Sequence, residues 1–272
     1  MSRSKRWGAA VASVVLAGAL AAGLFVAAAS HAGDDGRKHE SWSWTGTLSS
    51  GQLEINGVNG EIVAEPGTGD KVEVTADKSG RRSDPAEVKI DVVKDSDGIT
   101  ICAVYPGAGN ACEPGDHSSH THNNDVEVNF HVLVPGGVRF SANTVNGGVK
   151  VHGLSGPVKA HTVNGGCDIE TSSSGEAATV NGGVHAVLGK VPASGKLDFS
   201  TVNGSITLLL PDDLSADVEG STVNGGIESD FPVTMSGRWG PRSMHGTIGK
   251  GGAKLTASTV NGSIRLARAS AQ

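Results

Sequence analysis

The feature that most constrains the fold of this chain is a short repeat. The pentapeptide TVNGG or TVNGS occurs six times, beginning at Thr144, Thr162, Thr179, Thr201, Thr222 and Thr259. If SMHGTI at Ser243 is counted as a degenerate copy, successive copies start 16 to 22 residues apart. A period in this range is typical of proteins built from stacked coils. The repeat therefore predicts one structural unit used many times over.

Each place in the repeat has a physical role. Asn-Gly is the pair that most readily adopts positive φ, so the chain is expected to turn there. The second and sixth places form apolar columns, and the stretches after the turn alternate apolar and polar residues as half-buried strands do. With a related corner in LEINGVNGEIVAE included, the predicted structural turns lie at Asn59, Asn146, Asn164, Asn181, Asn203, Asn224 and Asn261.

Two all-β architectures satisfy this pattern. The first is a single-domain β-solenoid, with coils of about 16 to 22 residues and Asn-Gly corners. The second is an antiparallel β meander or sandwich in which Asn-Gly closes hairpins. The solenoid is favoured because identical residues recur at fixed places while spacer length varies. Stacked asparagines also gain amide hydrogen bonds that a meander does not offer.

The chain divides into four predicted segments. Residues 1–32 form a signal peptide or membrane anchor, residues 33–44 a polar tether, residues 45–140 irregular β coils, and residues 141–268 the regular solenoid. Strand candidates such as KVEVTA and VEVNFHVLV place the irregular half in the same stack. Trp42 and Trp44 are predicted to cover the open first coil, because unpaired terminal strands invite aggregation.

The N-terminal segment predicts export. Three cations precede an uncharged run at residues 8–29, and small residues follow it. A cleaved leader would deliver the protein to the periplasm, the cell surface or the medium; an uncleaved one would anchor it in the inner membrane. Removing residues 1–32 deletes three cations and no acids, so the formal net charge moves from −6 to −9. An acidic body without a basic cluster argues against a nucleic-acid partner.

Three cysteines occur in the sequence. In an oxidising compartment, Cys102 and Cys112 are placed to form a disulfide across CAVYPGAGNAC, with two free thiols as the alternative. Cys167 occupies the sixth place of the repeat, where other copies have Val or Ile. It is therefore expected to be a small buried apolar residue and not a nucleophile.

Together, LEINGVNGEIVAE, a strand ending in VLVPGGV and the serial TVNGG coils resemble the putative adhesin family of bacterial envelope β-solenoid domains, a family of unknown function. The resemblance extends over roughly residues 45–266. It implies an exported, surface-facing protein. It supplies neither a ligand nor catalytic residues.

Two stretches are candidate binding sites. His117, His120 and His122 lie close together in DHSSHTHNND, and imidazoles beside carboxylates can bind zinc or copper. Arg238, Trp239 and Arg242 lie in GRWGPRS, where an aromatic ring between guanidinium groups could stack on a sugar or a peptide. The alternatives are a solvated loop for the histidines and a tryptophan folded over a solenoid corner.

A third candidate is a strip of basic residues on the first two regular coils. Lys150, His152, Lys159 and His161 are expected to point outward, where they could contact an acidic glycan or lipid. The alternative is that they only keep the sheet surface hydrated.

The resulting hypothesis is a non-catalytic, exported envelope protein that acts as an adhesin or scaffold and needs no cofactor. Its partner would be a surface glycan or protein, with membrane contact only through an uncleaved N-terminal segment. The sequence contains no Gly-x-Ser-x-Gly, Walker or His-Glu-x-x-His motif. The competing hypotheses are a glycan-acting β-solenoid enzyme and a periplasmic metal-binding module that uses the histidine stretch.

Overall fold

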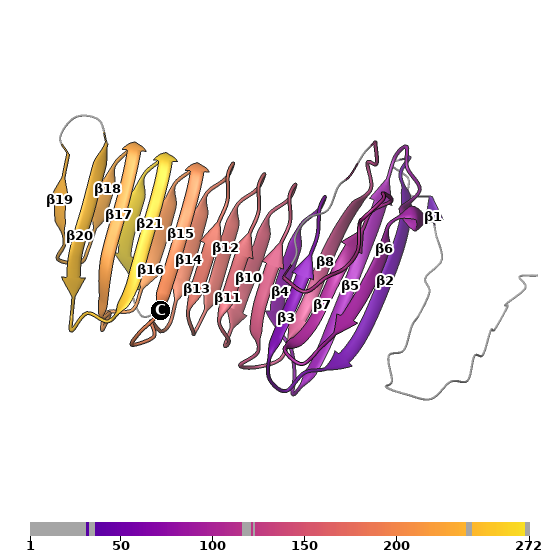
Figure 1. The fold of residues 1–272 in the computed structure, drawn as a ribbon, viewed down its shortest axis with the longest axis horizontal. Helices are drawn as coiled ribbons and strands as arrows, with labels where there is room; N and C mark the ends of the chain where they lie inside the picture. The colour runs from indigo at the N-terminus through magenta and orange to yellow at the C-terminus, as the bar shows by residue number, and fades with distance from the viewer. Residues whose placement is uncertain (1–30, 33–35, 116–120, 122, 238–240, 270–272) are drawn as a thin grey trace, which may run out of the picture.

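The structure is a flattened β-solenoid made of two sheets that face each other across an apolar core (Figure 1). It is a computed structural model, and it describes residues 31–32, 36–115, 121, 123–237 and 241–269. Parallel pairing dominates both sheets, and antiparallel strands occur at the ends of the stack. The predicted solenoid is confirmed, and the meander is excluded for the TVNG coils.

The two sheets, here called sheet A and sheet B, each contain 11 strands within the described residues. In spatial order, sheet A consists of β1 (His31–Ala32), β2 (Lys38–Thr47), β5 (Lys71–Gly80), β8 (Glu127–Val134), β4 (Ile62–Pro66), β10 (Val149–Leu154), β12 (Cys167–Thr171), β14 (Val184–Leu188), β16 (Ile206–Leu210), β22 (Ile264–Arg268) and β18 (Ile227–Ser229).

Sheet B lies opposite and ends on the same two sides of the stack. In spatial order it consists of β19 (Thr234–Ser236), β20 (Arg242–Ile248), β17 (Ala216–Asn224), β21 (Ala253–Asn261), β15 (Lys196–Asn203), β13 (Gly175–Ala178), β11 (Val158–His161), β9 (Arg139–Asn143), β3 (Gln52–Asn56), β7 (Gly98–Val104) and β6 (Lys89–Lys94). A short 3-10 helix, η1 (Pro85–Glu87), precedes β6.

A coil is one strand of sheet B, an Asn-Gly corner and one strand of sheet A. In chain order these are coil 1 (β3–β4), coil 2 (β9–β10), coil 3 (β11–β12), coil 4 (β13–β14), coil 5 (β15–β16), coil 6 (β17–β18) and coil 7 (β21–β22). A further coil without this corner, the cap coil (β7–β8), lies outside coil 1.

The repeated threonine and glycine join each corner to the next. The Thr162 hydroxyl donates a 2.7 Å hydrogen bond to the Gly147 carbonyl of the neighbouring coil, and equivalent bonds occur at the other TVNG threonines. The glycine after asparagine has no room for a side chain. A Cβ at Gly165 would collide with the Gly147 carbonyl oxygen. The next place is looser, which explains why Ser205 and Ser263 are accommodated there.

The corner asparagines form the predicted ladder. The ladder runs in the order Asn59, Asn146, Asn164, Asn181, Asn203, Asn261 and Asn224, and each asparagine after Asn59 donates from Nδ2 to the Oδ1 of the one before it at 2.8 to 2.9 Å. A hydrogen bond of this kind contributes about 1 kcal/mol net. The ladder thus supports each joint modestly and fixes its register.

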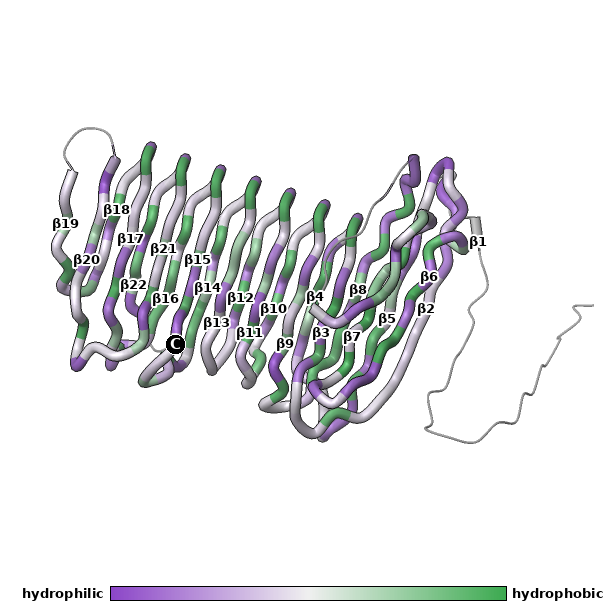
Figure 2. The backbone as a smooth tube through the Cα atoms, in the orientation of Figure 1, coloured by the Kyte–Doolittle hydropathy of each residue, from purple (hydrophilic) through white to green (hydrophobic). Residues whose placement is uncertain are grey.

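The two apolar columns differ in where they point. The sixth-place residues are buried in the core, except for half-buried Ile227 in the edge strand, and Cys167 is 1% exposed. The second-place valines line the corner edge instead, which forms an apolar ridge along the top of the stack (Figure 2). From Val163 onward these valines are 38 to 43% exposed. The threonine before each valine turns inward in its place.

The order of the coils differs from the prediction. Coils 2 to 5 stack in chain order, but coil 7 lies between coils 5 and 6, and coil 1 lies between the cap coil and coil 2. The segment at Ser243 is not a degenerate coil. It forms β20, which pairs antiparallel with β17. Without Asn-Gly it has no tight corner, so it runs straight along the edge of coil 6.

Two predictions about the N-terminal region can be compared with the structure. The tether proposed for residues 33–44 is wrong from Lys38 onward, because β2 begins there and pairs antiparallel with β5. Trp44 is 4% exposed, and the ammonium of Lys94 lies 5.2 Å from the centre of its ring. Residues 1–30 of the proposed export segment lie outside the described residues. Within the described residues, no helix has the length and apolar character needed to cross a membrane.

Candidate binding pocket beside the disulfide loop

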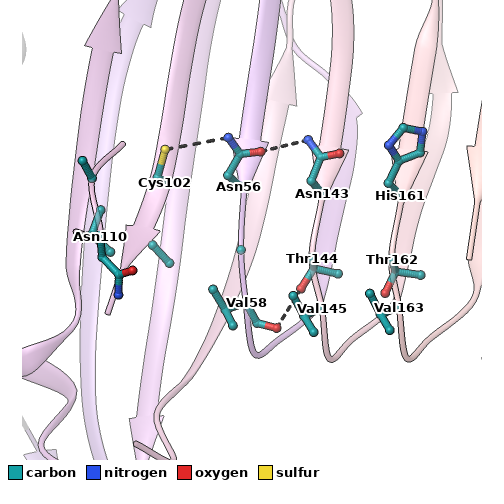
Figure 3. A pocket seen from close by; sticks show the side chains of 14 residues that line it. Asn56, Val58, Cys102, Asn110, Asn143, Thr144, Val145, His161, Thr162 and Val163 are labelled. Atoms are coloured by element: carbon teal, nitrogen blue, oxygen red, sulfur yellow. Dashed lines mark hydrogen bonds between the residues drawn. The ribbon is translucent and has the colours of Figure 1, made fainter. Parts of the chain in front are cut away.

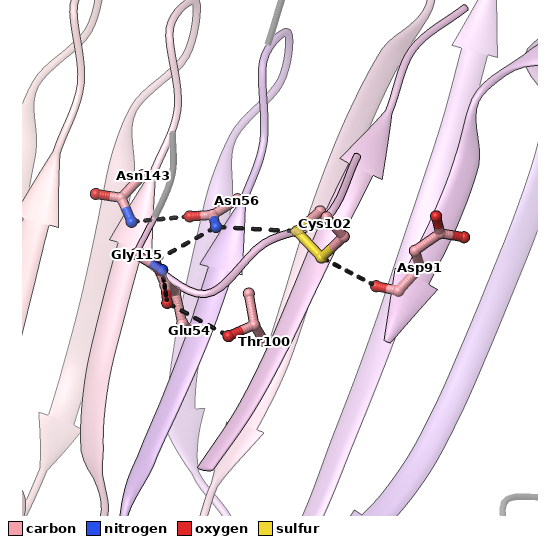
Figure 4. Close-up of a disulfide and its surroundings, with 8 residues drawn as sticks. Glu54, Asn56, Asp91, Thr100, Cys102, Gly115 and Asn143 are labelled. Atoms are coloured by element: carbon pink, nitrogen blue, oxygen red, sulfur yellow. Dashed lines mark hydrogen bonds between the residues drawn. A yellow bond between two sulfur atoms is a disulfide. The ribbon is translucent and has the colours of Figure 1, made fainter. Parts of the chain in front are cut away.

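The loop after β7 crosses the outer face of sheet B and is held there by a covalent bond. Cys102 in β7 forms a disulfide with Cys112, as predicted, and the Cα atoms are 5.5 Å apart (Figure 4). Cys102 pairs in register with Asn56 of coil 1. The disulfide therefore closes the loop beside the polar outer surface of coil 1.

Beneath this loop is a buried carboxylate. Glu54 is 3% exposed and accepts hydrogen bonds from Asn56 Nδ2 at 3.3 Å, Thr100 Oγ1 at 3.4 Å and the Gly115 amide at 3.1 Å. Buried charge is tolerated only when it is satisfied in this way. Glu54 thus ties the end of the loop to coil 1.

The start of the loop is fixed by a tyrosine. The Tyr105 hydroxyl donates a 2.8 Å hydrogen bond to the Val126 carbonyl, and Asn110 Nδ2 donates to the Tyr105 carbonyl at 3.1 Å. Burial raises the pKa of Tyr105 well above its usual range. The hydrogen bonds of Tyr105 therefore fix the start of the loop.

A cavity of about 190 Å³ lies between this loop and the corners of coils 1 to 3 (Figure 3). Its polar wall is a row of side chains on adjacent strands, Asn56, Asn143 and His161, which pair in register. Asn143 Nδ2 donates to Asn56 Oδ1 at 2.9 Å, which fixes the orientation of both amides. Both asparagines are more than nine-tenths buried.

The remaining wall is apolar. Corner valines of three successive coils, Val58, Val145 and Val163, line the cavity together with Ala103 and Ala111. Among the described residues that line it, His161 is the one titratable side chain, because Cys102 is in the disulfide. Pockets for drug-sized ligands span about 300–1,000 Å³. This smaller cavity suits one uncharged group, such as a side chain or a sugar substituent.

The sites proposed from sequence are not brought together here. His117, His120, His122, Arg238 and Trp239 lie outside the described residues, so neither the metal site nor the aromatic site is placed. Arg242 is exposed at the start of β20, at the opposite end of the stack from the pocket. Among the described residues, no cluster of three or more His, Cys, Asp or Glu side chains could hold a metal ion.

The basic strip is largely neutralised. Lys150 pairs with Glu61 at 2.7 Å and Lys159 with Glu176 at 3.1 Å. The hydrogen bond that Lys150 donates to the Glu61 carboxylate is the main reason that the pKa of Lys150 is raised. These pairs reduce the net positive charge that the two lysines give to the outer surface of coils 2 and 3.

Sequence reasoning missed the pocket because its parts come from four separate segments. Asn56 and Asn143 look like ordinary outward residues of their strands. The one available signal was position. Asn143 and His161 directly precede the repeated threonine, whereas Ala178, Ser200, Ser221 and Ser258 are small at that place in later coils. The larger side chains mark where the outer surface of the solenoid changes.

Together, the serial Asn-Gly corners and the two parallel sheets define the architecture, and the sequence profile of the Toastrack DUF4097 family matches residues 114–267. This chain belongs to the Toastrack DUF4097 family. The match covers more than half of the sequence and includes coils 2 to 7. The Toastrack family is one of unknown function, so membership settles the fold and leaves the ligand open. No curated protein matches the chain.

Solved structures resemble this Toastrack protein at low sequence identity. A structure described as a putative cell adhesion protein from Clostridium sporogenes is 12% identical, with a TM-score of 0.45, and the alignment covers 84% of this chain and all of the other. One described as a putative adhesin from Bacteroides fragilis is 10% identical, with a TM-score of 0.37, covering 84% and 97%. One described as a putative adhesin from Parabacteroides distasonis is 12% identical, with a TM-score of 0.26, covering 84% and 97%.

Proposed function

We propose that this Toastrack protein is a non-catalytic, extracytoplasmic binding module, an adhesin or scaffold whose ligand inserts an uncharged group into the pocket beside the disulfide loop. The observation that carries the proposal is the preformed cavity itself. Its walls are fixed by the disulfide, the buried Glu54 and the paired amides of Asn56 and Asn143. Preorganised walls favour binding, because little conformational entropy is lost when the ligand arrives.

The chemistry of the lining supports binding more than catalysis. General acid–base catalysis needs positioned groups that exchange protons, usually in pairs. In this pocket amide and apolar side chains make up most of the lining, with His161 at one end of the row that contains Asn143 and Asn56. Amide groups beside an apolar wall suit an N-acetyl group or a neutral amino-acid side chain. The disulfide favours a location outside the cytoplasm, where such bonds persist.

The test compares two corner substitutions. Val163→Trp places a large side chain at the pocket, whereas Val202→Trp places the same side chain at the equivalent corner of coil 5, and the two valines are 38% and 39% exposed. Binding of the wild type and both variants is measured against N-acetylated glycans and neutral peptides. We expect Val163→Trp to weaken binding at least tenfold and Val202→Trp to change it less than twofold. Equal effects of both variants would contradict the assigned site.

A further inference from the structure

Coil 7 occupies a slot between two coils that precede it in the chain. Strand β21 pairs with β15 on one side and β17 on the other, and β22 lies between β16 and β18. In sheets A and B, coils 5 and 6 are therefore joined only through coil 7. Whatever fills this slot holds the C-terminal end of the stack together.

Coil 7 makes the hydrogen bonds of the repeat with both coils that flank the slot. Thr259 Oγ1 donates to the Gly204 carbonyl at 2.9 Å, and Thr222 Oγ1 donates to the Gly262 carbonyl at 2.8 Å. The amide of Asn261 continues the ladder toward Asn203 and accepts from Asn224 in the same way. The slot thus recognises a TVNG coil by its hydrogen bonds and close glycine contacts. A second copy of this chain carries an identical coil.

The inserted coil also supplies a complete layer of the core. Its inward side chains, Ala253, Leu255, Ala257, Ile264 and Leu266, have no exposed surface. An empty slot would expose the matching apolar side chains of coils 5 and 6, which is strongly unfavourable. The slot is therefore filled by the chain's own coil 7 or by that of another molecule.

The connection that delivers coil 7 is short and conformationally demanding. Residues 249–252 cross the width of β17, because β20 and β21 lie on opposite sides of that strand. Gly249, Gly251 and Gly252 have φ values of 60°, 70° and 130°, which side-chain-bearing residues rarely adopt. A Cβ at Gly249 would lie 2.7 Å from the Leu214 carbonyl oxygen. Tight hinge loops of this kind favour exchange between molecules, since opening the hinge releases the constraint.

From these observations we propose that the slot is a self-association site, in which two copies of this chain exchange coil 7. Each copy inserts its coil 7 between coils 5 and 6 of the other, and residues 249–252 act as the hinge. Every contact of the slot is kept, and only the hinge changes conformation. Reciprocal exchange of this kind closes into a two-fold symmetric dimer.

The test uses cysteines on two differently tagged copies. Ser200 and Ser258 are paired across β15 and β21 on the outer surface, at a spacing that permits a disulfide. Both copies carry Cys167→Val, which restores the residue type of the other coils at that place and removes the free thiol. One copy also carries Ser200→Cys and the other Ser258→Cys. After co-production and mild oxidation, we expect a disulfide-linked species that carries both tags.

A second cysteine pair shows whether a negative result comes only from a local defect in the first pair. Thr207 and Arg265 are paired in the other sheet, so Thr207→Cys on one copy and Arg265→Cys on the other report the same exchange. Ser200→Cys on both copies is the negative control, because exchange does not bring the two Ser200 positions together. If neither pair yields a species with both tags, while each pair forms a disulfide when both cysteines are on one chain, the proposal is overturned.

The length of the hinge provides an independent test of the exchange. An insertion of four residues, Gly-Ser-Gly-Ser, between Gly251 and Gly252 would let coil 7 reach its own slot without the tight turn. We expect the fraction of the dual-tagged species to fall at least threefold. An unchanged fraction would contradict the assignment of residues 249–252 as the hinge of an exchange.

Discussion

Both ends of the stack contain an inserted coil, but different structures hold that coil in place at each end. At the N-terminal end, coil 1 lies between the cap coil and coil 2, which both follow it in the chain; at the C-terminal end, coil 7 lies between coils 5 and 6, which both precede it. At the N-terminal end, the inserted coil 1 lies under a loop closed by Cys102 and Cys112, and antiparallel strands extend both sheets. At the C-terminal end, sheet A stops at the three-residue strand β18, and no disulfide occurs among the described residues there.

This difference shows how one repeat supports two behaviours. Coil 7 makes the Thr and Asn hydrogen bonds of the repeat with both of its neighbours, whereas coil 1, which has Gly57 at the threonine place, makes them only with coil 2. Coil 1 is covered by the loop that the disulfide closes, whereas coil 7 is joined to coil 6 through β19, β20 and a tight glycine turn. We therefore expect the N-terminal end to be the rigid, ligand-presenting end and the C-terminal end to be the one that exchanges.

The largest expected effect separates inserted coils from edge coils. Ile264 in coil 7 has no exposed surface, whereas Ile227 in β18 is half-buried at the end of sheet A. Ile264→Ala should lower the free energy of unfolding by about 4 kcal/mol and Ile227→Ala by about 1 kcal/mol, measured by urea denaturation. Similar losses for both variants would contradict the placement of coil 7 inside the stack.

The next effect tests backbone approach at the inserted coil. A Cβ at Gly262 would collide with the Gly204 carbonyl oxygen, so Gly262→Ala should lower the free energy of unfolding by about 3 kcal/mol. The control is Gly183→Ser, one place later in the pentapeptide, where Ser205 and Ser263 are found in other coils. The control should cost less than about 0.5 kcal/mol. Thermal or urea unfolding of both variants decides the point.

The disulfide prediction applies to the N-terminal end alone. Replacing Cys102 and Cys112 by serine opens a loop with a sequence separation of 10, which should cost about 2–3 kcal/mol. Hydrogen exchange should accelerate in β3 and β7 and stay unchanged in β21. Loss of protection along the whole stack would show instead that the disulfide supports the fold globally.

A smaller effect concerns the buried thiol in the middle of the stack. Burial raises the pKa of Cys167 to about 12, so the folded protein has almost no thiolate at pH 8. A thiol-reactive dye should therefore modify Cys167 only as fast as the protein opens. Cys167→Val should leave stability within about 1 kcal/mol of the wild type, because it matches Val149 and Val184. Rapid labelling of the folded protein would show that this layer is accessible.

The smallest effect is a pH dependence at the N-terminal end. Asp125 accepts hydrogen bonds from the backbone amides of Ser83 and Arg82, and these hold its pKa well below the usual range. Because the unfolded state binds the proton more readily, this stabilisation is present above the unfolded pKa near 4 and is lost as pH falls. Asp125→Asn should therefore destabilise the protein more at pH 7 than at pH 2, as measured by thermal unfolding. An equal loss at both pH values would contradict the role of the charge.

Much of the fold was predictable because each residue type in the repeat has a known conformational or hydrogen-bonding preference. Asn-Gly fixed the corners, and the gain from stacked amides at Asn146 and Asn164 favoured a solenoid over hairpins. The order of coils was not predictable, because Thr201, Thr222 and Thr259 begin nearly identical units that fit one another in any order. The absence of Asn-Gly at Ser243 was a sign that this segment departs from the stack.

The pocket was harder to predict for a different reason. It depends on which outward residues become neighbours, and residues from 56 to 163 contribute to it. The disulfide was predictable from the spacing of Cys102 and Cys112, but the face that its loop covers was not. That face is set by Glu54 and Gly115, whose contact joins residues 61 positions apart.

The most direct test of the account is a set of cysteine pairs that reports the order of coils 5, 7 and 6, whether coil 7 comes from the same copy or from another. In the Cys167→Val background, cysteines at Ser221 and Ser258 should crosslink readily, because these residues are paired in register on adjacent strands. Cysteines at Ser200 and Ser221 should not, since two strand spacings separate them by about 10 Å, beyond the reach of about 7 Å that a disulfide allows. An efficient crosslink between Ser200 and Ser221 would mean that coil 6 stacks directly on coil 5. That result would contradict the placement of coil 7 between them.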